Sequence, residues 1–176
     1  METNLNWSKS PSFNAKHWFH KTWNFSTLSF SHIEEDFTNS YQPGGTLTAV
    51  MDHWTPRVMS TAQDLFGLGH WSYISLRGKQ GKIVTIVSAY HISQKSSTSV
   101  GVKTAFMQQK RRIQSAFISS SLLHLTPNPN RQFILDLQVW LQDLQSQNHQ
   151  IILGLDNNDD LYAAEGSVDP LPHTPC

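Results

Sequence analysis

The chain has 176 residues, of which 38% are hydrophobic and 15% charged, with 13 basic and 13 acidic side chains. This length supports one domain with a real core, and the balanced charge excludes an overall basic or acidic field that would attract a partner. The single cysteine, Cys176, cannot form an internal disulfide, which favours an intracellular setting, the nucleus or the cytoplasm. No stretch approaches about 20 apolar residues, so no membrane partner is expected.

The first third of the chain predicts one short helix and two strands. Ser10 followed by Pro11 is typical of a helix start, with the serine as cap and the proline in the first turn. Residues 25–30 alternate apolar and small polar side chains, as a strand does. Turn-forming residues at 41–45 then lead into a second strand at 46–51.

The middle of the chain predicts a β-hairpin. Residues 71–77 and 82–90 both have strand character, and a four-residue turn at 78–81 joins them. The second strand is rich in β-branched residues, including Ile86 and Val87, so we expect it to be buried on both faces.

Two helices and a last strand follow the hairpin. The first helix is expected over residues 104–123, ended by Pro127 and Pro129, and the second over residues 132–146. An apolar strand then covers residues 150–155. Mixed strands with helices packed outside them predict an α/β (α+β) sandwich.

The end of the last strand carries the strongest candidate for chemistry. If the extended geometry continues, Asp156 and Asn158 project to the same face, because residues two apart on a strand do so. The carboxylate could then orient or deprotonate a water molecule, and the amide could hold a phosphoryl oxygen. Spacing alone favours the alternative, a strand followed by an Asx turn.

The run Gly154-Leu155-Asp156-Asn157-Asn158 resembles the Gly-Asp-x-Asn signature of the endonuclease/exonuclease/phosphatase superfamily. Leu155 departs from that signature, because the family places glycine directly before the aspartate. Asp156 and Asn158 stand at the signature positions. The closest resemblance is to the endonuclease-like domains of retroelements.

Three further segments resemble the family in its own order. Met1-Glu2-Thr3-Asn4 is similar to a Gln-Glu-Thr-Lys strand end, and Gly44-Gly45 is similar to the paired glycines that begin a structural strand. Residues 86–90 resemble an apolar strand that ends in a tyrosine, here Tyr90. Ile92 departs from the proline that the family usually has two residues later.

The resemblance implies a metal-dependent phosphodiesterase-type hydrolase, endonuclease-like, with DNA as substrate. Glu2 would bind Mg²⁺ or Mn²⁺, Asp156 would activate the attacking water, and Asn158 and Tyr90 would bind phosphoryl oxygens. It also implies a partial four-layer, two-sheet fold over residues 1–160. Residues 161–176 are expected to be a turn-rich tail, and whether that tail is ordered stays open.

The family's remaining motifs fall outside this sequence. Its first strand would precede Met1, and its final Asp-His pair would follow Cys176. His173 lacks a preceding aspartate and is not assigned that role. Two alternatives therefore stay open: a catalytically inactive truncated fragment or binding module, and a phosphatase of a phosphorylated lipid or inositol. A partial sandwich also exposes a sheet edge, which predicts oligomerisation.

Overall fold

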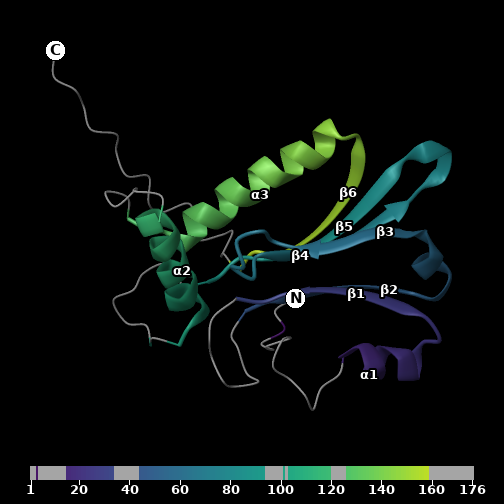
Figure 1. Ribbon diagram of the computed structural model, residues 1–176, viewed down its shortest axis with the longest axis horizontal. Helices are drawn as coiled ribbons and strands as arrows, with labels where there is room; N and C mark the ends of the chain where they lie inside the picture. The colour runs from purple at the N-terminus through teal and green to yellow at the C-terminus, as the bar shows by residue number, and fades with distance from the viewer. Residues whose placement is uncertain are drawn as a thin grey trace.

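The computed structural model describes residues 3, 15–33, 44–93, 101, 103–119 and 126–158. They form α1 (Ala15–Thr22), β1 (Ser26–Ser31), β2 (Thr46–Met51), the 3-10 helix η1 (Asp52–Arg57), β3 (Val58–Gln63), β4 (Trp71–Arg77), the 3-10 helix η2 (Lys79–Gly81), β5 (Ile83–Tyr90), α2 (Ala105–Ser119), α3 (Pro129–Ser146) and β6 (His149–Asp156). Strands β1 and β2 pair in one sheet, and the other four form a second sheet in the order β3-β4-β5-β6 (Figure 1). The fold is thus mixed α/β with two sheets, as expected.

The two sheets lie face to face, with α1 and α3 on their outer sides (Figure 1). Buried hydroxyl groups join the facing layers. Thr46 and Thr48 on β2 contact Ser72 on β4, with Oγ–Oγ distances of 3.0 and 3.1 Å, and the Thr48 hydroxyl also donates to the Ser72 carbonyl at 2.9 Å. These hydroxyls satisfy one another, so their burial leaves no unmatched polar group at this point.

Helix α3 covers the outer face of the four-stranded sheet. Phe133 and Leu137 on the helix pack with Trp71 and Val87 on the strands, and the Trp140 ring stacks on Trp71 at 5.3 Å. The helix therefore buries an apolar stripe of the kind that the sequence predicts over residues 132–146.

Strand β5 is covered on both faces, as its β-branched composition predicts. Val87 belongs to the cluster under α3, whereas Ile86 packs against the cluster of Val50 and Ile74 between the two sheets. A strand enclosed in this way needs apolar residues at consecutive positions, which explains why it does not alternate.

Two elements differ from the sequence expectation. The sequence does not predict strand β3 (Val58–Gln63), because its residues, none of which is buried, have no apolar alternation. Helix α3 begins at Pro129 and not at residue 132. The Asn128 side chain accepts a hydrogen bond from the Arg131 amide, so the proline occupies the first turn of this helix. Ser10, Pro11, residues 120–123 and the tail 161–176 lie outside the described residues.

Candidate functional site

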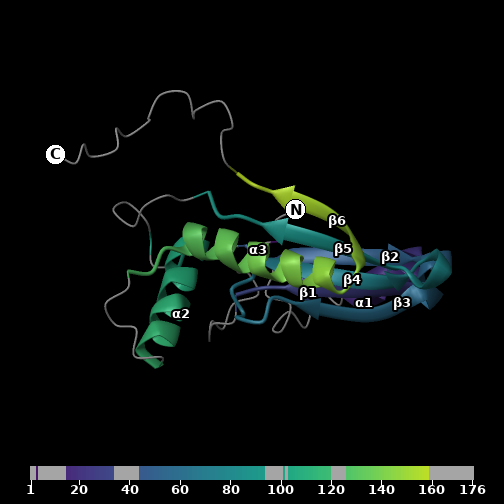
Figure 2. The ribbon, with the colours of Figure 1, turned by 90° about the horizontal axis from the view of Figure 1, so that it is seen from above.

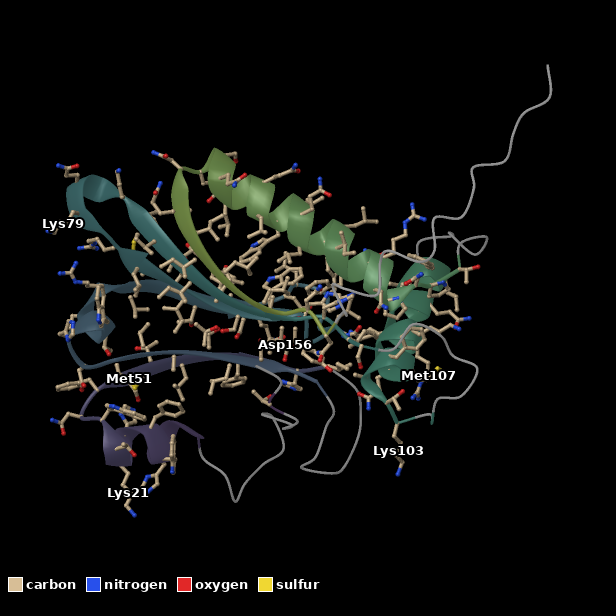
Figure 3. The ribbon with its side chains drawn as sticks, turned by 180° about the vertical axis from the view of Figure 1, so that it is seen from behind. Lys21, Met51, Lys79, Lys103, Met107 and Asp156 are labelled. Atoms are coloured by element: carbon tan, nitrogen blue, oxygen red, sulfur yellow. The ribbon has the colours of Figure 1, made fainter. Side chains whose placement is uncertain are left out.

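The predicted residues Tyr90 and Asp156 lie at the same edge of the four-stranded sheet. Strands β5 and β6 are parallel, and the Tyr90 Cα is paired directly with the Asp156 Cα. The carboxyl ends of both strands therefore meet here. Figure 3 shows Asp156 at the end of the sheet that is nearer to α2. The structure thus brings together two residues that are 66 positions apart in the sequence.

His91 joins the ends of these two strands through three hydrogen bonds. Its amide donates to the Asp156 carbonyl at 2.9 Å, and its ring Nδ1 donates to the Asn157 carbonyl at 3.1 Å. Its own carbonyl accepts from the Asn158 side-chain Nδ2 at 3.1 Å. His91 therefore fixes the segment from Asp156 to Asn158 relative to Tyr90. The sequence does not predict this role of His91, because a histidine after a strand carries no signal of it.

Asn158 does not continue the strand. Strand β6 ends at Asp156, and Asn158 has a φ of 47°. The expectation that Asp156 and Asn158 share a strand face is therefore wrong, since the backbone turns into the left-handed region that asparagine tolerates. Its side chain still lies at this edge, where the bond to His91 holds it.

Asp156 is half-buried at the strand end. Within the described residues its carboxylate takes part in no hydrogen bond or ion pair, although its backbone carbonyl is bonded to the His91 amide. A carboxylate in this state can accept a proton or hydrogen bonds from a bound molecule.

The predicted metal ligand Glu2 lies outside the described residues, but its neighbour Thr3 does not. The Thr3 amide donates to the Gly45 carbonyl at 3.1 Å. A Cβ atom placed on Gly44 would lie 3.6 Å from the Tyr90 ring, and one placed on Gly45 would lie 2.7 Å from the Ser31 carbonyl. The paired glycines are thus structural, as expected, and Thr3 is attached to the backbone that borders Tyr90.

A buried carboxylate, Asp64, organises the loop beside this edge. It accepts hydrogen bonds from the Ser31 hydroxyl at 2.9 Å, the Leu68 amide at 2.9 Å and the His70 amide at 3.0 Å. The His70 carbonyl in turn accepts from the Tyr90 amide at 2.8 Å. This network links both sheets to the end of β5. Its only sequence signal is an aspartate that precedes a glycine-containing loop.

The His70 ring is enclosed by aromatic neighbours. It contacts Phe133 edge-on at 5.2 Å and Trp71 at 5.7 Å. Burial lowers the pKa of His70 to about 4, although the charge of Asp64 and the side chain of Gln109 act in the opposite direction. The ring is therefore neutral at pH 7 and serves packing at this position.

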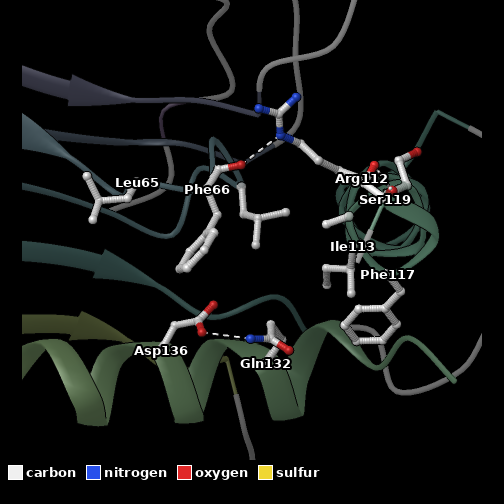
Figure 4. A pocket seen from close by; sticks show the side chains of 11 residues that line it. Leu65, Phe66, Arg112, Ile113, Phe117, Ser119, Gln132 and Asp136 are labelled. Carbon is white, nitrogen blue, oxygen red and sulfur yellow. Dashed lines mark hydrogen bonds between the residues drawn. The ribbon is translucent and has the colours of Figure 1, made fainter. Parts of the chain in front are cut away.

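A hollow of about 510 Å³ lies between α2, α3 and the loop that contains Phe66 (Figure 4). The Arg112 Nε donates to the Phe66 carbonyl at 2.7 Å on one side, and the Gln132 amide donates to Asp136 at 2.7 Å on the other. Burial raises the pKa of Asp136, against the effect of its Gln132 bond. The hollow contains none of the residues predicted for catalysis.

The comparisons with known proteins leave the chain unassigned. No family model matches it, and no curated protein or solved structure matches it. Among the residues that the structure describes, no three His, Cys, Asp or Glu side chains gather as a ready metal site. None of the helices in those same residues combines the length and apolar character needed to cross a membrane.

Proposed function

We propose that this chain carries part of a metal-dependent phosphodiesterase site of the endonuclease/exonuclease/phosphatase type, with DNA as substrate. The observation that carries the proposal is the pairing of Tyr90 with Asp156 at the carboxyl ends of adjacent parallel strands. His91 adds Asn158 to the same edge. Ligands of open α/β sheets bind at such strand ends. The layering of helices outside two facing sheets agrees with the two-sheet fold that the family resemblance implies.

The Asp156 carboxylate at this edge is of the chemical type that suits Mg²⁺ or Mn²⁺. These hard cations take carboxylate oxygens, keep several waters, and need only one or two protein carboxylates beside a substrate phosphate. Asp156 offers a carboxylate without a partner among the described residues, and Glu2 precedes Thr3, which is bonded at Gly45. We assign Glu2 as the metal ligand. When bound, the cation would neutralise charge that develops on the phosphoryl oxygens.

The side chains then divide the remaining work. Asp156 takes a proton from the water that attacks phosphorus, as the ester P–O bond opposite the attacking water breaks. Asn158 has two N–H groups on its amide, of which one is bonded to the His91 carbonyl. We assign the other to a phosphoryl oxygen. We assign a second hydrogen bond to the phosphoryl group to the hydroxyl of Tyr90, whose ring is 5% exposed and packs with Ile33 and Phe106.

Plasmid nicking in the presence of Mg²⁺, by a parent polypeptide that extends this chain at both ends, tests this proposal. Asp156→Asn should slow nicking by about 100-fold or more, because removal of a general base typically costs two to four orders of magnitude. Asp52→Asn is the matched control, because it makes the same chemical change at an exposed residue. Asp52 begins η1, directly after the end of β2, whereas Gly44 and Gly45 precede the start of β2. The nicking rate of this variant should stay at the parent level.

Two results would contradict the proposal. One is an Asp156→Asn variant that nicks as fast as the parent. The other is a folded parent that neither nicks DNA nor binds Mg²⁺ in calorimetry, which would favour the inactive fragment or binding module. Hydrolysis of inositol phosphates without plasmid nicking would replace DNA by the alternative substrate class.

A further inference from the structure

Strand β6 forms one edge of the four-stranded sheet. It is paired with β5 along its whole length, from His149 to Asp156, and among the described strands it has no neighbour on its other side. Figure 2 shows β6 at the margin of the sheet, beyond β5. An edge strand of eight residues is long enough to pair with another strand.

The hydrogen-bond pattern identifies which backbone groups face outward. The Asp156 carbonyl is bonded to His91 after β5, so the backbone of Asp156 faces β5. The N–H and C=O of one strand residue point to the same side, and this side alternates along the strand. Ile151, Leu153 and Leu155 therefore direct their backbone groups toward the open edge.

The side chains of this edge are apolar on both faces of the sheet. Ile152 is 57% exposed on one face, and Leu153 and Leu155 are 38% and 43% exposed on the other, where Ile151 packs toward α3. No lysine, arginine, glutamate or proline occurs between Gln150 and Leu155. Edge strands that stay free usually contain such residues, because they prevent pairing with another chain.

The opposite edge, β3, has the protection that β6 lacks. The pairing of β3 with β4 shifts between Val58 and Ser60, which is a β-bulge or similar irregularity that interrupts a regular edge. The contrast between the two edges indicates that β6 is suited to be covered.

We propose that a second copy of this chain covers β6 by antiparallel pairing about a two-fold axis at Leu153. This register places Leu153 opposite Leu153 of the second copy and Ile151 opposite its Leu155, so outward-facing backbone groups meet outward-facing groups. It also places the Gln150 amide opposite the Asp156 carboxylate at both ends of the pairing. The edge is thus self-complementary in backbone, apolar contact and polar ends, as a two-fold interface requires.

Sedimentation equilibrium at tens of micromolar tests the pairing on the full chain. The parent should have twice the 20.0 kDa mass of one chain, and Ile152→Lys should have the mass of a single chain. Met59→Lys is the matched control, because Met59 is 49% exposed on the protected edge β3 and should leave the dimer intact. Leu153→Pro provides a second variant that removes one outward N–H without touching the β5 ladder.

A monomeric parent would overturn the proposal and leave the edge to a different polypeptide. Ile152→Lys and Leu153→Pro variants that both remain dimeric would overturn it too. Species larger than a dimer would do the same, because each copy has a single β6 edge and the two-fold pairing closes at two. Circular dichroism on each variant shows whether the fold survives the substitution.

Discussion

Replacing Asp64 with asparagine tests whether the buried carboxylate network holds the loop before β4. Oδ2 of Asp64 accepts from the Ser31 hydroxyl and the His70 amide, and Oδ1 accepts from the Leu68 amide. Asparagine has the same shape but only one acceptor oxygen. If the asparagine oxygen takes the place of Oδ2, the asparagine NH₂ group takes the place of Oδ1. The NH₂ group then faces the Leu68 N–H, and two hydrogen-bond donors oppose each other.

The cost follows from the bonds that change. A hydrogen bond to a charged group contributes about 1.5–3 kcal/mol, and a buried donor left without a partner costs a comparable amount. The two bonds that remain also become weaker, because the acceptor is no longer ionised. We therefore expect Asp64→Asn to lower the free energy of unfolding by about 3 kcal/mol. Ser31→Ala removes one donor and leaves the carboxylate two partners, so its cost should be about 1 kcal/mol.

Urea unfolding at pH 7, followed by circular dichroism, measures these differences. Asp143→Asn serves as the control, because Asp143 is exposed on α3 and its carboxylate accepts a hydrogen bond from the nearby Gln147 side chain. Its effect should stay within about 0.5 kcal/mol. An Asp64→Asn variant as stable as this control would refute the reasoning, since it would mean that the three bonds do not discriminate a carboxylate from an amide.

Three further predictions concern His91, Phe133 and His70, which lie close to the start of β4 and the carboxyl end of β5 or pack against residues there. His91→Phe keeps the ring contact with Phe133 but removes the hydrogen bond to the Asn157 carbonyl, so plasmid nicking should slow while the melting temperature changes little. His91→Asn returns an N–H at the δ position and should therefore nick faster than His91→Phe. Phe133→Ala should cost about 3–5 kcal/mol in urea unfolding, because it empties the space between α3 and β4. The pKa of His70 is about 4 in the folded chain, whereas its ordinary value, expected in the unfolded chain, is 6.5. Between these pH values the His70 ring binds a proton in the unfolded chain but not in the folded chain. Stability should therefore fall as the pH falls through this window, by up to about 3 kcal/mol relative to a His70→Phe variant, and the difference should be flat above pH 7.

Local sequence patterns were sufficient for most of the elements. Strands β2, β4 and β5 fall where apolar and β-branched runs predict them, and the four-residue turn between β4 and β5 was identified from its glycines. The sequence does not predict strand β3, because its pairing with β4, and not its own composition, makes it a strand. Helix α3 begins three residues before the predicted start, because Pro129 can either end one helix or begin the next, and the Asn128 cap decides between these.

The candidate site divides in the same way. The sequence predicts Tyr90 and Asp156 as site residues through the resemblance of their segments to the family's strand-end motifs, whereas spacing alone favours an Asx turn at Asp156. Their direct pairing depends on the parallel register of β5 and β6, which brings distant segments together and which no local pattern encodes. The contributions of His91 and Asp64 are hydrogen bonds made largely to backbone groups far away in the chain. Side-chain identity alone cannot predict such bonds, so only the tertiary structure decided them.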